Sequence, residues 1–262
     1  MTRAVFLGGG DDAKWIYQEL EKARPDALIL GMVGEKDWLL GKWGVVDFVR
    51  PADIRDVLRK LNKFGITSVA FFGKPVASIS WKDLSPHTYK LLLQSIPYFS
   101  RSLPNVYFAF LLERLKSKDI STFNVGEIIS HIQQPSGTTW GVPTDYDMFA
   151  AYERARTEMD GRRADWRKQG TLFLANGEVK TETSSTKKLI RNAGRDLHGA
   201  ILVKSEVSVY KNLDTPVIEE ELLHLCANNG IAGIITDASA IVIDSKNLCN
   251  LATRLGLFVH FI

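Results

Sequence analysis

A lysine and an aspartate in the second half of the chain lie where functional side chains are commonly found. Lys204 ends an apolar run that has the composition of a buried strand, and Asp214 lies in an irregular stretch before Pro216 and a helical pattern. Segments at strand ends have few regular backbone hydrogen bonds and often display binding or catalytic groups. Asp214 has two interpretations, which the sequence leaves open: it caps the following helix, or it coordinates a divalent cation.

A glycine-rich turn follows the first apolar run of the chain. Residues 8–13 read GGGDDA and fit the relaxed dinucleotide pattern G-x-G-x-x-A between a predicted strand and a predicted helix. Glycines at this point let the backbone approach a pyrophosphate, and the helix N-terminus offers amide donors. Asp11 and Asp12, however, place two negative charges where a phosphate would lie. The turn therefore has two interpretations. Gly9 and Gly10 contact a nucleotide, or the turn is purely structural.

Two further basic features have both a functional and a structural interpretation. Lys74 follows Gly73 at the carboxyl end of a predicted strand, where it either pairs with a phosphate or is a solvated loop lysine. A second group of cations surrounds Trp166, the mixture that a contact with lipid headgroups requires. Acidic neighbours dilute its charge, so we favour a solvated helix face. Its basic members are Arg154, Arg156, Arg162, Arg163, Arg167 and Lys168.

The sequence contains none of the common short patterns for a metal site or a catalytic triad. The two cysteines, Cys226 and Cys249, form no CxxC pair, and we expect apolar buried thiols in a reducing compartment. The five histidines lie far apart, without H-x-x-H or H-E-x-x-H spacing, and each is expected to be structural. No Ser–His–Asp or Cys–His arrangement can be assigned.

Apolar runs alternate with helical patterns along the chain, which predicts an α/β fold. Residues 1–133 are predicted to form a Rossmann-like N-terminal domain with a parallel sheet and helices on both faces. Residues 134–145 combine Pro, Gly, Ser and Thr without periodicity and are predicted to be a linker. Residues 146–262 are predicted to form a second α/β domain, with a hairpin turn at Asn176 and Gly177 and a helix over residues 217–228.

The composition is that of an ordinary globular protein. Of 262 residues, 45% are hydrophobic and 24% are charged, which excludes a disordered or collagen-like chain. No apolar run approaches the roughly 20 residues of a membrane-spanning helix, and glycines and aspartates interrupt the N-terminal apolar stretch, unlike a signal peptide. The net charge of +3 is too small to indicate nucleic-acid binding, although it allows weak attraction to anionic ligands or membranes.

Several short motifs of the C-terminal third occur in one characteristic order. They are Lys204, residues 214–218 (DTPVI), residues 229–234 (NGIAGI), Asp237 with Ala238, and residues 252–259 (ATRLGLFV). Together they resemble the LpxI-type UDP-2,3-diacylglucosamine diphosphatase family. The glycine turn at residues 8–10 and the pair Gly73 and Lys74 match the first domain of that family in order and spacing. The resemblance covers effectively the whole chain.

The resemblance implies a two-domain cytoplasmic enzyme of lipid A biosynthesis. Members of the family use a divalent metal to hydrolyse the pyrophosphate of UDP-2,3-diacylglucosamine, bound between the domains, to UMP and 2,3-diacylglucosamine 1-phosphate. Asp214 matches one of the two aspartates in the family's Gln-Asp … Asp-Leu-Pro-Thr-Ile-Gly stretch. We expect Asp214 and Lys204 to be catalytic, and Asp214, Asp237 (at a predicted strand end) and Glu182 to hold Mg²⁺ or Mn²⁺ in a site altered from that of the family. Thr186 and Lys187 are expected to bind the phosphate groups of the substrate, and Gly9, Gly10 and Lys74 are expected to bind substrate because they lie at predicted strand ends. The expected partners are the lipid-linked UDP-sugar and the inner-membrane surface, but no nucleic acid.

Two departures from the family pattern leave an alternative open. The family's Pro-Gly-Gln-Asp is replaced, after a one-residue deletion, by residues 208–211 (SVYK), and its Glu-Gly-Thr-Asp becomes residues 184–187 (SSTK). Two carboxylates that would bind a hard cation are therefore missing. The alternative is a homologue that binds a nucleotide-sugar lipid, or a partner protein, without hydrolysis. A nicotinamide oxidoreductase, the function that residues 8–13 alone would indicate, explains nothing in the second half.

Overall fold

A computed structural model divides the chain into two compact units, Met1–Ile129 and Ser130–Ile262. It describes residues 2–32, 36–50, 52–73, 84–94, 103–143, 147–161, 170–181, 185–194, 197–206, 212 and 215–262. The α/β class predicted from the sequence is confirmed, with a parallel sheet in the first unit and a mixed sheet in the second. Among the helices of the described residues, none is long and apolar enough to cross a membrane.

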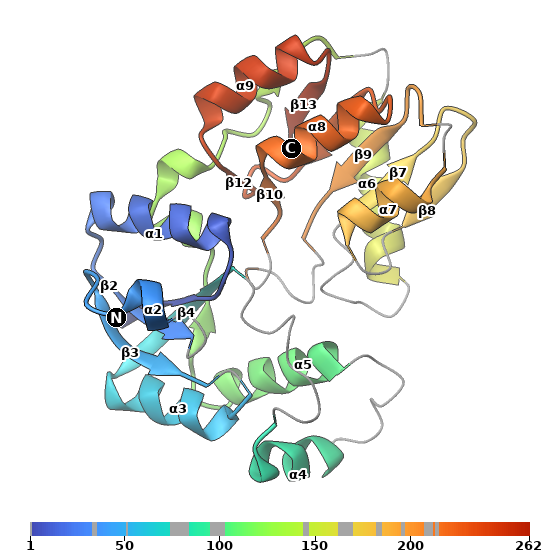
Figure 1. Cartoon of the computed structure of the whole chain (residues 1–262). Coiled ribbons are helices and arrows are strands. Elements are labelled where there is room, and N and C mark those ends of the chain that lie inside the picture. The colour runs from blue at the N-terminus through green and yellow to red at the C-terminus, as the bar shows by residue number, and fades with distance from the viewer. Residues whose placement is uncertain are drawn as a thin grey trace. The chain divides into compact units, whose positions relative to one another are not determined.

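The first unit alternates strands and helices, as Figure 1 shows. In chain order the elements are β1 (Thr2–Leu7), α1 (Asp11–Ala23), β2 (Ala27–Met32), α2 (Lys36–Leu39), β3 (Val45–Val49), α3 (Ile54–Lys63), β4 (Ile66–Phe72), α4 (Pro86–Gln94), α5 (Leu103–Lys116), β5 (Ser121–Thr122) and a 3-10 turn (Val125–Glu127).

The strands of the first unit form a parallel sheet in the order β3-β2-β1-β4-β5. Helix α1 covers one face of this sheet and α3 covers the other (Figure 1). Opposite faces follow from the strand order, because right-handed crossovers run outward from β1 to β3 and then return past β1 to β4. Strands β1, β2 and β4 are buried over most of their length, as expected of parallel strands covered on both faces.

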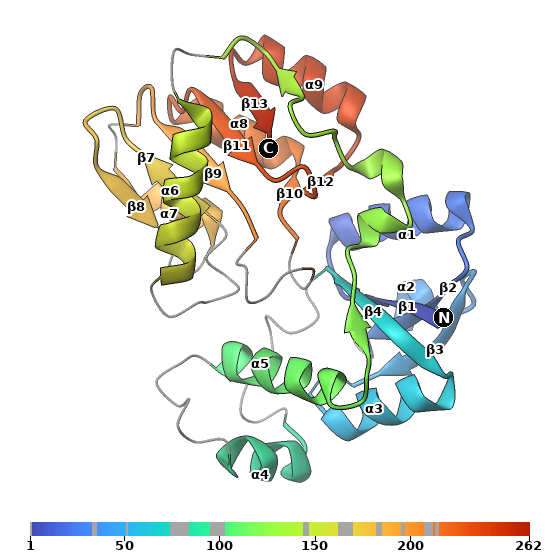
Figure 2. The same cartoon turned by 180° about the vertical axis from the view of Figure 1, so that it is seen from behind.

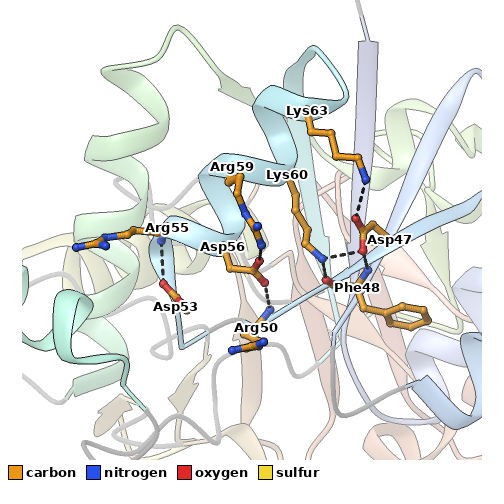
Figure 3. Close-up of polar contacts among 9 residues, drawn as sticks. All are labelled: Asp47, Phe48, Arg50, Asp53, Arg55, Asp56, Arg59, Lys60 and Lys63. Atoms are coloured by element: carbon orange, nitrogen blue, oxygen red, sulfur yellow. Dashed lines mark hydrogen bonds and ion pairs between the residues drawn. The ribbon is translucent and has the colours of Figure 1, made fainter.

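Ion pairs join the edge strand β3 to α3 (Figure 3). The Asp47 carboxylate accepts hydrogen bonds from Lys60 Nζ at 2.7 Å and from Lys63 Nζ at 3.4 Å. Arg59 Nη2 donates to Asp56 Oδ1 at 2.5 Å. The hydrogen bond from Lys60 holds the pKa of Asp47 well below its ordinary value, at about 2. Three of the four basic residues of α3 are thus paired with carboxylates.

The second unit contains more and shorter strands. In chain order the elements are a 3-10 turn (Ser130–Ile132), β6 (Thr139–Trp140), α6 (Met148–Gly161), β7 (Gly170–Phe173), β8 (Val179–Thr181), α7 (Thr186–Asn192), β9 (Ile201–Lys204), β10 (Val217–Ile218), α8 (Glu220–Asn228), β11 (Gly233–Thr236), β12 (Ile241–Val242), α9 (Ser245–Arg254) and β13 (Phe258–Phe261).

Six of these strands form a mixed sheet in the order β6-β13-β11-β9-β7-β8. β9, β11 and β13 are parallel, whereas β6, β7 and β8 run antiparallel to their neighbours. Figure 2 shows α6 on one face, where Ala155 packs with Val203 and Phe258. Helices α7, α8 and α9 cover the other face, where a second buried cluster includes Leu202 and Ile234. β10 and β12 form a separate parallel pair.

One local prediction for the second unit is confirmed and one is wrong. Asn176 and Gly177 turn the antiparallel β7–β8 hairpin, with Gly177 at φ 84°. The predicted helix over residues 217–228 begins instead at Glu220, because Val217 and Ile218 pair with β12 as a strand. Within the predicted linker, residues 134–145, Thr139–Trp140 forms β6 and pairs with β13.

Candidate functional site

Parallel strands of the second unit end at one edge of the mixed sheet. β9 is followed by Ser205 and Glu206, and β11 is followed by Asp237. The ladder pairs Lys204 with Thr236, so the residues after these two strands lie side by side. Because open α/β sheets bind their ligands beyond the carboxyl ends of the strands, this edge is the expected place for a site.

Asp237 is buried at this edge, with 9% of its surface exposed, and accepts three hydrogen bonds. Its Oδ1 accepts from the hydroxyl group of Tyr152 on α6 and from Ser205 Oγ at 2.9 Å. Its Oδ2 accepts from the backbone amide of Glu206 at 2.7 Å. Hydrogen bonds to an ionised carboxylate are stronger than those between neutral groups. One side chain therefore joins α6 to the segments that follow β9 and β11.

Tyr152 keeps its proton over a wide pH range. Burial raises the pKa of Tyr152 to about 12, and the negative charge of Asp237 and the hydrogen bond to it act in the same direction. The phenol is therefore a hydrogen-bond donor at neutral pH. Arg156 follows one turn later on the same face of α6, with its guanidinium carbon 5.8 Å from the centroid of the Tyr152 ring. This helix thus brings a donor and a cation to the edge of the sheet.

A cavity of about 340 Å³ opens at this edge. Its lining combines one guanidinium group, two carboxylates and three hydroxyl groups. The lining residues are Tyr152, Arg156, Ser205, Glu206, Asp237, Ala238, Ser239 and Ile262. Such a cavity suits a polar ligand that presents an anionic group to Arg156 and hydrogen-bonding groups to the hydroxyls.

Lys204 and Asp237 lie at the same edge of the sheet but are directed toward opposite faces. Lys204 follows Leu202, of the α8 face, at the strand period of two, whereas Asp237 contacts α6. Burial raises the pKa of Cys226 on α8 to about 12, and the positive charge of Lys204 opposes that shift. Lys204 is itself buried. The two predicted residues are therefore neighbours in the sheet, each facing a different helix layer.

Thr186 and Lys187 begin α7, where Ser185 accepts a hydrogen bond from the Lys188 amide at 3.2 Å. Lys187 Nζ forms ion pairs with Glu221 and, at 3.3 Å, with Glu219. Burial lowers the pKa of Lys187, but the hydrogen bond to Glu221 and the charge of Glu219 outweigh it, so the pKa is raised. The described contacts thus engage Lys187 in tying α7 to α8.

Gly9 and Gly10 of the first unit lie beside Gly73. Gly10, at φ 109°, precedes α1, and the Gly8 amide donates to the Phe72 carbonyl at 2.8 Å. A Cβ at Gly73 would lie 3.0 Å from the Gly9 carbonyl oxygen. This close approach gives Gly73 a structural reason to lack a side chain, and the positive φ of Gly10 gives it one of its own. The contact places the turn after β1 against the end of β4.

A divalent metal does not fit the described residues alone. Asp214, Glu182 and Lys74 lie outside the residues that the structure describes. Within the described ranges, no group of three or more His, Cys, Asp or Glu is arranged to hold a metal ion. Asp237, the predicted ligand inside these ranges, already has three hydrogen-bond donors on its two oxygens. These donors occupy most of the acceptor positions that a cation would need.

Four polar residues of the cavity were not predicted as a site: Tyr152, Ser205, Glu206 and Ser239. A fifth, Arg156, was noted only as part of a basic helix face. Ser205 and Glu206 had a usable signal, because they directly follow Lys204 at a predicted strand end. Tyr152 had none, because the helical pattern of α6 does not indicate which strand it meets.

Comparison of the sequence with models of known protein families, and with curated proteins, gives no match. The fold and the site therefore define a class rather than a particular activity. The chain is an α/β protein with a buried carboxylate and a polar cavity at the carboxyl edge of a mixed sheet.

Proposed function

We propose that this chain hydrolyses the pyrophosphate bond of UDP-2,3-diacylglucosamine, which gives UMP and 2,3-diacylglucosamine 1-phosphate. The observation that carries the proposal is the cavity at the carboxyl edge of the mixed sheet, which Arg156 lines together with Ser205. Guanidinium groups bind phosphate oxygens in a fixed, bidentate geometry. The choice of substrate rests on the resemblance of the C-terminal motifs, in particular Lys204 and Asp214.

The proposed chemistry is the attack of water on a phosphorus atom of the diphosphate. The P–O bond of the anhydride breaks and UMP departs as the leaving group. Asp214 orients the water and accepts its proton, and Arg156 and Lys204 neutralise the charge that develops on the phosphate oxygens. Asp237 is a positioning residue, because it fixes Ser205 at the start of the segment that continues to Asp214.

The proposal extends to features beyond the reaction itself. A Rossmann-like fold of the first unit is supported by the strand order β3-β2-β1-β4-β5. A cytoplasmic location at the inner-membrane surface is supported by the two acyl chains that such a substrate carries. Mg²⁺ or Mn²⁺ enters the proposal through the resemblance, so the dependence on metal is measured directly in the experiment below.

A second candidate function is the binding of a nucleotide-sugar lipid, or of a partner protein, without hydrolysis. The observation that favours it is the hydrogen bonding of Asp237, whose oxygens accept from Tyr152, Ser205 and Glu206. A carboxylate engaged in this way stabilises the fold and has little capacity left for a metal. The two carboxylates missing from the family pattern favour the same candidate.

The two candidates are separated by measuring both UMP release and substrate binding. The purified chain is incubated with UDP-2,3-diacylglucosamine in detergent micelles, with Mg²⁺, with Mn²⁺ or with a chelator, and UMP is quantified by chromatography. Hydrolysis predicts UMP release that falls by about 100-fold or more in Asp214→Ala. The matched control is Asp26→Ala, since Asp26 is an exposed aspartate of the first unit.

Each outcome decides between the candidates. UMP release that Asp214→Ala abolishes and Asp26→Ala preserves supports hydrolysis. Binding of the substrate without UMP release supports the second candidate. The absence of both binding and release would overturn hydrolysis and the binding of a nucleotide-sugar lipid, and an unchanged rate in Asp214→Ala would remove Asp214 from the reaction.

A further inference from the structure

A hollow of about 520 Å³ lies on the first unit where α3 and α4 begin. We call it the α3–α4 hollow, and its lining residues are Asp53, Arg55, Ser85, Pro86, His87 and Lys90. Two contacts fix the starts of the helices beside each other. The Ile54 amide donates to Thr88 Oγ1 at 3.1 Å, and the Ser85 amide donates to the Ala52 carbonyl at 3.4 Å.

Positive charge from three helices gathers around His87. Arg55 belongs to α3, Lys90 to α4 and Arg114 to α5. Burial lowers the pKa of His87 below its ordinary value, and the charges of Arg55, Arg114 and Lys90 lower it further, whereas Asp53 raises it. Burial and the three cations thus act in the same direction on the pKa of His87.

These cations are not compensated by carboxylates as the others on α3 are. Figure 3 shows the side chain of Arg55 extending away from the paired Arg59, Lys60 and Lys63. In the part of the chain that the structure describes, neither Arg55 nor Lys90 forms an ion pair. Among the lining residues, the two cations Arg55 and Lys90 accompany one carboxylate, Asp53, so the hollow keeps an excess of positive charge that an anion neutralises favourably.

Three backbone donors at the two helix starts are already used. Asp53 Oδ1 accepts from the Arg55 amide at 3.1 Å, Thr88 Oγ1 accepts from the Ile54 amide, and Ser85 Oγ accepts from the Thr88 amide at 3.2 Å. We therefore assign the binding of an anion in the hollow to side chains. Asp53 is engaged in capping α3, which leaves the cations as the groups available to a ligand.

We propose that the α3–α4 hollow binds a phosphate group through Arg55, His87 and Lys90. Arg55 offers a planar, bidentate donor and Lys90 offers a compact ammonium, the two groups that proteins use most for phosphate. His87 becomes a third cation when a bound dianion raises its pKa. The phosphate belongs either to a small soluble molecule or to a lipid headgroup. This site is independent of the hydrolysis proposed for the second unit.

The test uses the full chain and two probes. Inorganic phosphate is titrated into the protein by calorimetry near pH 6.5, the ordinary pKa of histidine. Vesicles of phosphatidylglycerol and phosphatidylcholine are compared with vesicles of phosphatidylcholine alone in a flotation assay. The variant Arg55→Gln/Lys90→Gln is expected to weaken binding by about tenfold or more, because two charge-assisted hydrogen bonds are lost. The control Lys118→Gln/Lys246→Gln removes the same charge from exposed lysines outside the hollow.

A second measurement does not depend on any variant of the cations. The pKa of His87 is followed by NMR in the unmodified protein, with its resonance assigned through His87→Gln. We expect phosphate to raise this pKa. Binding of inorganic phosphate assigns a free phosphate, and binding of the anionic vesicles alone assigns a lipid headgroup. Equal weakening by both double variants, a pKa of His87 that does not change in the presence of the probe that binds, or no binding of either probe would overturn the proposal.

Discussion

The hydroxyl group of Tyr152 donates a hydrogen bond to the carboxylate of Asp237, and this contact joins α6 to the carboxyl edge of the mixed sheet. The two residues are 85 positions apart in the sequence. Ser205 and the Glu206 amide bind the same carboxylate, so the ends of two neighbouring strands and one helix depend on a single ionised group. The stability of this edge should respond to each of these donors.

Replacing Tyr152 with Phe removes one donor from a buried carboxylate. We expect the free energy of opening at this edge to fall by about 1.5–3 kcal/mol, the contribution of one hydrogen bond to a charged group. Hydrogen exchange of the β9 and β11 amides measures that free energy. A double-mutant cycle with Asp237→Ala is the control, because the two changes should be far from additive. Additive effects would mean that the hydroxyl and the carboxylate do not interact.

Asp47 should make stability depend on acid pH. Its pKa is about 2 in the folded chain against an ordinary value of 3.8, chiefly because Lys60 donates to it. The stabilisation by ionised Asp47 is therefore complete above about pH 4, and it is lost as the pH falls from about 4 through about 2. Because the pair is partly solvated, Asp47→Asn should cost about 1 kcal/mol at pH 7 and little at pH 2. Urea unfolding at both values measures the difference, and a cost that is equal at both would contradict the assignment. Asp26→Asn is the exposed control.

The two cysteines should differ in reactivity. Burial raises the pKa of Cys226 to about 12, whereas Cys249 is partly exposed and lies on α9. Since the thiolate is the reactive form, Cys249 should react first with a disulfide reagent such as DTNB in the native protein. Counting released thiolate before and after unfolding should give one and then two groups. Cys249→Ser should leave no reactive thiol until the chain unfolds, and rapid labelling of Cys226 would refute its burial.

Arg156 and Arg154 offer a matched pair on α6. Each guanidinium lies near an aromatic ring, Tyr152 at 5.8 Å and Phe173 at 5.7 Å, but Arg156 lines the cavity and Arg154 does not. If the cavity binds the diphosphate, Arg156→Gln should weaken the binding of UDP by about tenfold. Arg154→Gln should leave it within about twofold, as expected of an exposed charge. Calorimetry measures both, and equal losses would indicate only a general effect of charge.

Gly73 should tolerate no side chain. Its φ of 89° is unfavourable for other residues, and a Cβ would lie 2.9 Å from the Ala13 Cβ and 3.0 Å from the Gly8 carbonyl carbon. Gly65 is the control, because its φ is 61° and nothing lies within 4 Å of a Cβ there. Gly65→Ala should cost about 1–2 kcal/mol from backbone strain alone. Gly73→Ala should cost more in urea unfolding, and equal costs would remove the steric argument.

Much of the fold could be predicted because its signals are local. The strand–turn–helix at residues 2–23 and the Asn176–Gly177 hairpin each lie within one short stretch of sequence. The helix predicted from residue 217 failed because the pairing that overrides it is not local. Ile218 pairs with Val242, whose position in space no nearby pattern reveals. Local propensity is a weak guide where a tertiary partner decides.

The candidate site could be predicted only in part, for the same reason. Asp237 was found because it follows an apolar run, which marks a strand end. Tyr152 was missed because its hydroxyl is functional only through a carboxylate that the chain brings to it from another element. The sequence likewise does not reveal that Lys204 is directed toward α8, because this depends on which helices cover each face of β9. Which helix packs on which face of the sheet is known only from the folded structure.

The lengths of the outermost strands of the mixed sheet bear on how this protein behaves at high concentration. Within the described residues, the sheet ends in β6, of two residues, and in β8, of three, and these two strands leave few unpaired amide and carbonyl groups. A long open border would offer a template on which another chain could add a strand. β6 and β8 therefore offer little backbone with which another chain could pair by strand addition, the first step toward fibrils.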